Sequence, residues 1–220
     1  RRQRQMCIRD RLIKVSYSSL NYKDALSFSG NIGVSKNYPH TPGIDAVGIV
    51  KESSVSKFNV GDKVIVSGYD LGMNTAGGFG EYIRVPKEWV CHLPKGLKSI
   101  ESMIIGTAGL TAGLCIEMIM RKNDIAGKKV VVSGATGGVG TIAIKLLNMM
   151  GADVTAITSS IDSKEYLMMI GANEVISVSE LLDSTKKPLS KSVWSFAIDV
   201  VGGSILSALI VSMKYGGVIA

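Results

Sequence analysis

The pattern of hydrophobic and polar positions along the chain changes near residue 100. Before that point, short stretches rich in β-branched residues are separated by turns, and Gly61-Asp62 between two of them is a turn signal. These strand-like stretches cover residues 12–18, 45–53, 62–68, 81–86 and 90–94. They predict a small antiparallel β-barrel, which a short helical segment at residues 20–28 interrupts.

After residue 100, helix-like and strand-like stretches alternate. Residues 103–120 are almost entirely apolar and fit a buried helix. The strands predicted beyond it cover residues 129–134, 153–159, 174–178, 195–201 and 216–220, and the helices cover residues 139–151, 163–171 and 204–213. This alternation predicts a parallel sheet with helices on both faces, so the fold class is α/β.

The first eleven residues, RRQRQMCIRDR, differ in composition from the rest of the chain. They hold five of its seven arginines, and the string resembles a translated sequencing-adapter remnant. Residues 1–11 are therefore predicted to be foreign to the fold, rather than a tail that binds nucleic acid or membrane. Without these five arginines and one aspartate the net charge falls from +7 to +3. The basic charge then no longer argues for a polyanionic partner.

The remaining composition predicts a globular protein, because 46% of the residues are hydrophobic and 20% are charged. The apolar runs are shorter than a membrane span, and no signal peptide precedes them. Cys91 and Cys115 lie in no metal or disulfide spacing, which predicts small core residues in a reducing compartment. We therefore expect a cytoplasmic protein with no nucleic-acid or membrane partner.

A glycine-rich stretch, SGATGGVGT at residues 133–141, lies between a predicted strand and a predicted helix. Aligned on G-x-G-x-x-G it has an alanine in the first glycine position and reads Ala135, Thr136, Gly137, Gly138, Val139 and Gly140. Gly137 would let the backbone approach a pyrophosphate, Gly140 would let helix and strand pack closely, and the helix N-terminus would supply amide donors. The stretch predicts a dinucleotide-binding turn, with a tight turn that holds no ligand as the alternative.

Two other nucleotide-binding families do not fit this stretch. No lysine follows Gly140, as a P-loop would require, and none of the seven tyrosines has the lysine four positions later that a short-chain reductase needs.

The end of the second strand of the nucleotide-binding half selects between NAD and NADP. A carboxylate there would bind the ribose hydroxyls, but the strand ends in the neutral donors Thr158, Ser159 and Ser160. Asp162 is the nearest acid, and with Glu165 it forms the sequence of a helix capping box. Lys164 lies within reach of a 2′-phosphate, although a solvated helix lysine is the alternative. These residues predict NADP(H).

Three motifs of the first half resemble the N-terminal, GroES-like domain of medium-chain dehydrogenases/reductases. They are TPGIDAVGIVKES at residues 41–53, FNVGDKVIV at residues 58–66 and GGFGEYIRVP at residues 77–86. In the zinc-dependent members the first motif carries Gly-His-Glu, whereas this chain has Gly43-Ile44-Asp45. Ile44 cannot ligate a metal, and His40 and His92 have no partner ligands at zinc spacing. No metal is expected.

Within the zinc-free branch, the chain is similar to the acryloyl-CoA reductases. The motifs that carry this similarity are YSSLNYKDAL, PGID, MIIGTAGLTA, TGGVG, AIDVVG and YGGVIA. It implies a GroES-like domain at residues 12–100 and an incomplete Rossmann domain at residues 101–220, in a chain truncated at both ends. Two departures are Thr158-Ser159-Ser160, where the group has Ser-Gly-Arg, and Asn74-Thr75-Ala76, where it has Asn-His-Trp.

The resemblance implies hydride transfer from NADP(H) to the β-carbon of a short α,β-unsaturated acyl-CoA. The thioester oxygen gains enolate charge, so hydrogen-bond donors must face it. The candidate donors are Asn21 and Tyr22, with Lys23 as a weaker candidate, and Tyr22 could instead bind the cofactor. By resemblance alone, Thr111 lies near the nicotinamide. The predicted cofactor-binding residues are Tyr22, Thr111, Thr136, Gly137, Gly138, Val139, Gly140, Thr158, Ser159, Ser160 and Lys164.

Two other functions stay open. A quinone oxidoreductase would share the fold and the cofactor, and a non-catalytic dinucleotide-binding protein would keep the fold as a redox sensor or scaffold. The expected partner is a small acyl-CoA substrate, and the full-length form is expected to be a homodimer.

Overall fold

The computed structural model describes residues 10–53, 57–121, 124–186 and 192–220. The chain divides into two compact units, Arg1–Thr107 and Ala108–Ala220. The division falls seven residues after the change of pattern near residue 100, inside a helix rather than before it.

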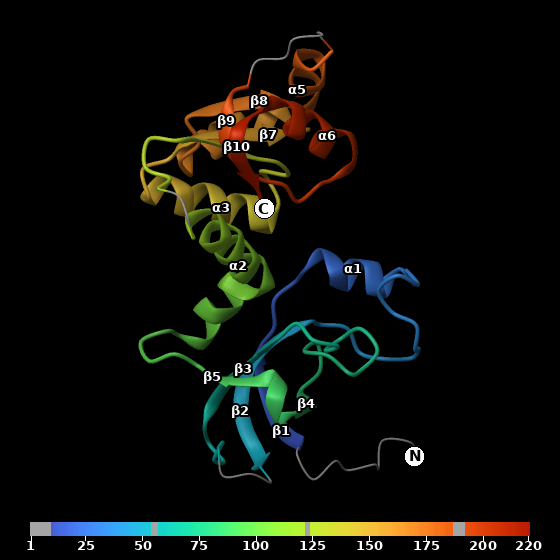
Figure 1. Ribbon diagram of the computed structural model, residues 1–220. Coiled ribbons are helices and arrows are strands. Elements are labelled where there is room, and N and C mark those ends of the chain that lie inside the picture. The colour runs from blue at the N-terminus through green and yellow to red at the C-terminus, as the bar shows by residue number, and fades with distance from the viewer. Residues whose placement is uncertain (1–9, 54–56, 122–123, 187–191) are drawn as a thin grey trace. The chain divides into compact units, whose positions relative to one another are not determined.

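The first unit is a five-stranded antiparallel sheet with the strand order β4-β1-β2-β3-β5. The strands are β1 (Asp10–Tyr17), β2 (Asp45–Ser53), β3 (Lys63–Ser67), β4 (Tyr82–Pro86) and β5 (Val90–His92). Helix α1 (Tyr22–Phe28) follows β1, and a 3-10 turn (Lys87–Trp89) precedes β5. Ile13, Val50, Val64 and Ile83 pack in the core inside the curled sheet. The predicted GroES-like sheet and its interrupting helix are confirmed (Figure 1).

Strand β1 begins earlier than the sequence predicted. Arg11 pairs with Ser53 of β2 and with Val85 of β4. Its side chain is buried, and its guanidinium carbon lies 5.6 Å from the centre of the Phe58 ring. The predicted strand therefore begins two residues too late, because ladder hydrogen bonds use the backbone and do not depend on composition. Residues 1–9 lie outside the described residues, and the foreign origin of residues 1–11 stays a prediction.

The second unit is a five-stranded parallel sheet with the order β10-β9-β6-β7-β8. The strands are β6 (Lys129–Val132), β7 (Asp153–Thr158), β8 (Glu174–Ser177), β9 (Trp194–Ile198) and β10 (Met213–Ile219). The helices are α3 (Gly138–Met149), α4 (Lys164–Met169), α5 (Val178–Ser184) and α6 (Gly203–Ser212), with a 3-10 turn at Ile161–Ser163.

Helices cover both faces of this parallel sheet (Figure 1). Ile144 and Leu147 of α3 pack with Val130 on one face, while Leu181 of α5 and Leu209 of α6 belong to the core on the other face. The predicted doubly wound Rossmann sheet is confirmed. The sequence pattern did not predict α5, although its N-cap Ser177 accepts a hydrogen bond from the backbone of Glu180 at 3.1 Å.

Helix α2 (Ser99–Met120) carries the border between the two units, and Gly106 interrupts it. Gly106 has φ 48° and ψ −160°, which leaves fourteen continuous helical residues, 107–120. By length and composition the whole helix could cross a membrane, but a span needs about 20 continuous residues. In the most apolar window of α2, 33% of the residues are buried, so the prediction of a buried helix is wrong for the other residues of that window. Its buried face, which includes Ala112 and Ile116, packs with the core of α3.

Candidate functional site

The glycine-rich turn lies at the centre of the parallel sheet. It follows β6, whose neighbours are β7 on one side and β9 on the other. The strand order therefore reverses direction at β6, and open α/β sheets bind ligands outside the carboxyl end of the strands at such a point. Gly137 is the N-cap of α3, which begins at Gly138.

The glycines of this turn have separate roles. A Cβ on Gly140 would overlap the carbonyl oxygen of Gly134, so Gly140 permits the close packing of helix on turn. A Cβ on Gly137 would meet only that oxygen, at 3.3 Å, which leaves its outer side open to a ligand. Gly134 takes the left-handed conformation, with φ 57°, and its Cβ would lie 2.7 Å from Val200. The turn glycine is thus Gly134, whereas the sequence alignment gave the first glycine position to Ala135, which is buried in the core.

The outer surface of the turn offers amide donors to an anion. Thr136, Gly137 and Gly138 are exposed, while Val139 packs on the core. The first amides of a helix have no acceptor within it, and the helix dipole adds positive potential there. Thr141 closes the turn, because its hydroxyl and its amide donate to the carbonyl of Gly137 at 2.8 and 2.9 Å. The arrangement suits a pyrophosphate, and residues 134–138 are therefore named the phosphate turn.

A hydrogen-bonded tie between β6 and β9, which the sequence reasoning missed, supports this turn. The buried hydroxyl of Ser133 donates to the Asp199 carboxylate and accepts from the Val200 amide at 3.1 Å. Asp199 also accepts from the amide of Gly202 at 2.9 Å. The tie holds the segment after β9 beside the phosphate turn. A serine and an aspartate at the carboxyl ends of adjacent parallel strands were the available signal.

The end of β7 presents hydroxyl groups without a guanidinium. Thr158 is buried, and its hydroxyl accepts from the amide of Ser160 at 3.0 Å. Ser159 and Ser160 are exposed, as is Lys164. Hydrogen bonds from Ser177 lower the pKa of Glu180, and the positive charge of Lys164 adds a smaller effect, so Lys164 has an acidic neighbour.

The predicted capping box of Asp162 and Glu165 is wrong. The N-cap of the 3-10 turn is Ser160 and that of α4 is Ser163, and neither makes a side-chain cap bond. A 3-10 turn precedes α4, so the helix begins after Asp162. The spacing of Asp162 and Glu165 in the sequence did not predict this turn.

Thr111, expected near the nicotinamide, lies partly buried in the second segment of α2. In the same segment, Ala108 lies against the start of α3, since a Cβ on Gly138 would be 3.1 Å from the Ala108 methyl. The segment that carries Thr111 thus begins beside the phosphate turn.

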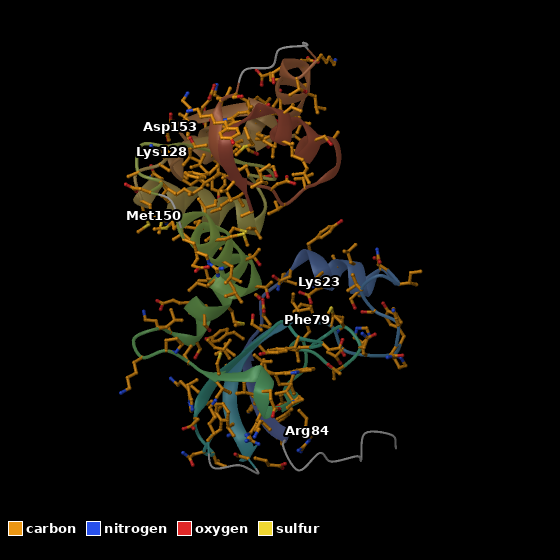
Figure 2. The ribbon with its side chains drawn as sticks, viewed as in Figure 1. Lys23, Phe79, Arg84, Lys128, Met150 and Asp153 are labelled. Carbon is orange, nitrogen blue, oxygen red and sulfur yellow. The ribbon has the colours of Figure 1, made fainter. Side chains whose placement is uncertain are left out.

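The candidate catalytic residues of the first unit lie at the start of α1. Tyr22 is the first residue of this helix and is 81% exposed. The Nδ2 atom of Asn21 donates to Asp45 at 2.9 Å and to Ser19 at 3.2 Å. An amide nitrogen carries two hydrogens, so both are already used within the unit. Lys23 lies on the exposed surface of α1 (Figure 2).

Asp45 organises the segment around these candidates, and the sequence reasoning gave it no role. Besides the bond from Asn21, its buried carboxylate accepts hydrogen bonds from the hydroxyl groups of Ser19, at 2.6 Å, and Ser67. It also accepts from the hydroxyl and the amide of Thr107, at 2.7 and 2.9 Å. Burial raises the pKa of Asp45, but the hydrogen bonds from Ser19, Ser67 and Thr107 outweigh it and lower the pKa overall. The carboxylate is therefore ionised at neutral pH.

No metal site is found among the residues that the structure describes, in which no three His, Cys, Asp or Glu side chains could hold an ion together. Ile44 is buried, and the Nε2 atom of His40 lies 2.9 Å from the Ser27 hydroxyl. Cys115 is partly buried but Cys91 is exposed, so the prediction of a core residue is wrong for Cys91.

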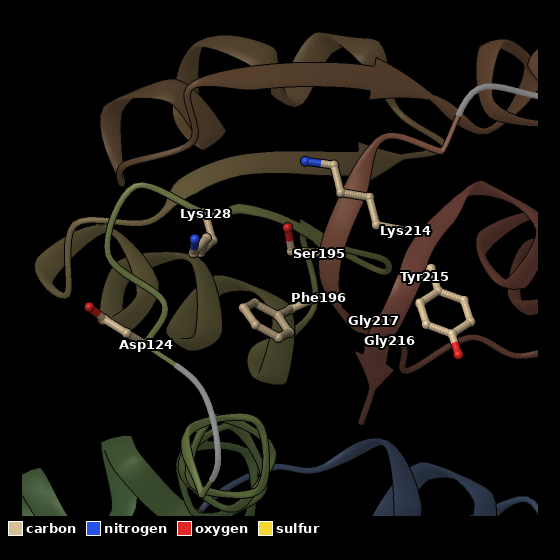
Figure 3. Close-up of a pocket in the computed structure, with 8 residues that line it drawn as sticks. All are labelled: Asp124, Lys128, Ser195, Phe196, Lys214, Tyr215, Gly216 and Gly217. Atoms are coloured by element: carbon tan, nitrogen blue, oxygen red, sulfur yellow. The ribbon is translucent and has the colours of Figure 1, made fainter.

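A cavity of about 410 Å³ lies at the other end of the parallel strands (Figure 3). Lys128 precedes β6, Ser195 is the second residue of β9, and Lys214 to Gly217 come from the first five residues of β10. The cavity is thus at the amino ends of the strands, away from the phosphate turn. Since ligands of open α/β sheets bind at the carboxyl ends, it is not the dinucleotide site.

Comparisons with known proteins agree with this fold. Residues 8–95 match the alcohol dehydrogenase GroES-like domain, and residues 138–220 match the zinc-binding dehydrogenase family. The chain belongs to the medium-chain dehydrogenase/reductase superfamily of oxidoreductases.

Its relatives include reductases with two kinds of name. A putative quinone oxidoreductase, YhfP of Bacillus subtilis, is 44% identical over 95% of this chain and 64% of its own length. A probable acrylyl-CoA reductase, AcuI of Escherichia coli, is 40% identical over 96% of this chain and 65% of its own length. The chain therefore spans just under two thirds of the length of these relatives.

Solved structures of such relatives contain a dinucleotide. The YhdH oxidoreductase of Salmonella enterica in complex with NADP superposes with a TM-score of 0.89 at 40% identity, over 96% of this chain and 64% of the other. B. subtilis YhfP with NAD bound gives the same TM-score at 43% identity and the same coverage.

Gly137→Val is expected to weaken NADPH binding by tenfold or more while the protein stays folded. The valine would project from the open side of the turn, where a pyrophosphate would lie. Fluorescence titration with NADPH measures the affinity, and circular dichroism checks the fold. Gly140→Val is the matched control, because its side chain would overlap Gly134 and should instead lower the melting temperature. Unchanged NADPH affinity in folded Gly137→Val would contradict the dinucleotide assignment.

Proposed function

We propose that the protein is an NADPH-dependent reductase of the C=C bond of short α,β-unsaturated acyl-CoA thioesters, with acryloyl-CoA as the type substrate, and that it works without a metal. The observation that carries the proposal is the environment of Asp45. Asp45 follows Ile44, which stands where zinc-dependent members hold a metal-binding histidine, and its carboxylate accepts hydrogen bonds from the neutral donors Ser19, Asn21, Ser67 and Thr107. It anchors the segment that carries Asn21 and Tyr22.

The reaction needs a hydride donor and a hydrogen-bond donor for the developing enolate. A nicotinamide nucleotide supplies the hydride when bound, with its pyrophosphate on the turn at Gly137. The Tyr22 hydroxyl is the donor to the thioester oxygen, since the side chain is exposed at the start of α1. Asn21 acts as a positioning residue, because both of its amide hydrogens are bonded to Ser19 and Asp45. Water delivers the proton to the α-carbon.

The cofactor of this proposal is NADP(H), selected at the end of β7. The exposed hydroxyl groups of Ser159 and Ser160 and the cation of Lys164 support a 2′-phosphate, and no carboxylate ends the strand. Relatives have been solved with NADP and with NAD. Without the arginine of the family pattern, the preference for NADPH over NADH should be small.

A quinone is the second candidate substrate, because the relative that is 44% identical is named a putative quinone oxidoreductase. The fold, the phosphate turn and Tyr22 would serve that reaction too. The third alternative, a non-catalytic dinucleotide-binding protein, is disfavoured. Such a protein would not need the Asp45 hydrogen bonds that fix the segment before the exposed Tyr22. The proposal also includes a cytoplasmic location and a homodimer of the full-length protein.

The full-length protein is expected to oxidise NADPH with acryloyl-CoA and to form propionyl-CoA, faster than it oxidises NADPH with any quinone. NADPH absorbance at 340 nm follows the reaction, and mass spectrometry identifies the product. Ser160→Arg should increase the preference for NADPH, because an arginine–phosphate pair is charge-assisted and can be bidentate. A large preference for quinones, or loss of activity with a chelator, would overturn the proposal. A wild type that prefers NADH would overturn the cofactor assignment alone.

A further inference from the structure

An apolar pocket of about 360 Å³ lies beside α1 within the first unit. One wall is a single face of this short helix and its N-cap, since its residues are spaced by three and four positions. Leu20, which precedes the N-cap, and Pro42 and Phe79, from two other segments, complete the lining. The helix residues are Asn21, Asp24, Ala25 and Phe28.

The lining of this pocket is held in place by backbone contacts. The buried carboxylate of Asp24 accepts from the amides of Gly43 and Ile44 at 3.1 and 2.9 Å, which ties α1 to the segment before β2. The amide of Phe79 donates to the carbonyl of Pro42 at 3.0 Å. Gly43 has φ 111°, and a Cβ on it would lie 2.9 Å from the Phe79 ring. The ring can occupy its observed position only because residue 43 has no side chain. The pocket is therefore preformed.

The polar groups in the lining are already used. Asp24 also accepts from the amide of Asn21 at 2.9 Å, and the Nδ2 hydrogens of Asn21 go to Asp45 and Ser19. A quinone ring bound here would bury a carbonyl that finds no donor among these side chains, and an unsatisfied buried acceptor weakens binding. A hydrocarbon chain has no such requirement. The lining thus favours an alkyl or alkenyl group.

The pocket is larger than the acryloyl group needs. Only two carbons of acryloyl extend beyond the thioester carbonyl, and a carbon with its hydrogens fills about the 30 Å³ that one water molecule occupies in the liquid. A volume near 360 Å³, part of which is the open mouth, therefore has room for several more carbons. Asn21 lines the pocket and immediately precedes Tyr22 along the chain.

We propose that this pocket binds the hydrocarbon tail of the thioester substrate, and that the substrate class extends to enoyl-CoA esters of about six carbons. The inference rests on the proposed function, since it places the reacting double bond beside Tyr22. It makes the residues of the pocket, and Ala25 above all, determinants of chain length. Ala25 is exposed on the pocket side of α1 and takes no part in the core, so it can be changed without unfolding the sheet.

The test is a comparison of chain lengths in wild type and in two variants at one position. In the wild type, kcat/KM should rise about fourfold per added methylene from acryloyl-CoA to hexenoyl-CoA, as burial of each methylene predicts. Ala25→Phe fills the pocket and should abolish this rise, so that kcat/KM for hexenoyl-CoA falls to about that for acryloyl-CoA. Ala25→Ser leaves the space open and should keep the rise. Calorimetric titration with propionyl-CoA and hexanoyl-CoA should show the same differences in affinity without turnover.

The outcomes separate the two proposals. If acryloyl-CoA is reduced but the wild type shows no dependence on chain length, or if Ala25→Phe lowers kcat/KM equally for all chains, the pocket assignment is wrong and the proposed function stands. If only quinones are reduced, the proposed function is wrong and the pocket assignment fails with it. Tighter binding of hexanoyl-CoA that Ala25→Phe removes would support the assignment.

Discussion

Asp45→Ala is expected to lower the free energy of unfolding by about 3 kcal/mol, because several partly buried donors would lose their acceptor at once. These donors belong to Ser19, Asn21, Ser67 and Thr107, in three separate segments of the first unit. Urea denaturation followed by circular dichroism measures the change. The control is Glu52→Ala at the exposed end of the same strand, which should change stability by less than about 0.5 kcal/mol.

The contribution of Asp45 should also depend on pH. Its pKa is lowered in the folded state, so its ionised form stabilises the protein fully above the pKa of the unfolded chain, near 4. This stabilisation is lost as the pH falls through the folded pKa. The difference in unfolding free energy between wild type and Asp45→Asn should therefore be constant near neutrality and shrink below about pH 4. A difference that grows in acid would contradict an ionised Asp45.

Tyr22→Phe is expected to lower turnover of acryloyl-CoA by roughly 100-fold, as the loss of one donor to a developing oxyanion does elsewhere. Apparent substrate affinity should change little, since the donor acts mainly in the transition state. Steady-state kinetics at saturating NADPH measures both quantities. The melting temperature should be unchanged, because the side chain is 81% exposed.

Tyr215→Phe is the matched control for Tyr22, as Tyr215 is a fully exposed tyrosine on β10 of the other unit. It should leave turnover unchanged. A different result for Tyr22→Phe would change its role: weaker NADPH binding, with turnover restored at high NADPH, would make Tyr22 a cofactor-binding residue.

Much of the fold was predictable because the periods of the two halves differ. Alternating stretches gave β2 at residues 45–53 without error, and the change to strand–helix alternation gave the parallel sheet. Helix α5 was missed because its short segment, residues 178–184, continues directly from β8 and has little apolar periodicity. The interruption at Gly106 was missed because a glycine in an apolar run does not reveal its φ angle.

The candidate site was predictable only where local sequence determines it. The turn at Gly137 and Gly140 follows from spacing, because the chain itself connects strand, turn and helix. The Asp45 network joins positions up to 62 residues apart along the chain, and the tie from Ser133 to Asp199 joins positions 66 apart. Such contacts depend on strand order and register, which one sequence does not specify.

The position of β6 has a consequence for how this architecture tolerates change. Two strands separate it from each edge of the described sheet, β7 and β8 on one side and β9 and β10 on the other. The glycines at the carboxyl end of β6 therefore do not contact the edge strands β8 and β10 through the sheet hydrogen bonds. Substitutions in the edge strands β8 and β10 should therefore leave the conformation of these glycines unchanged.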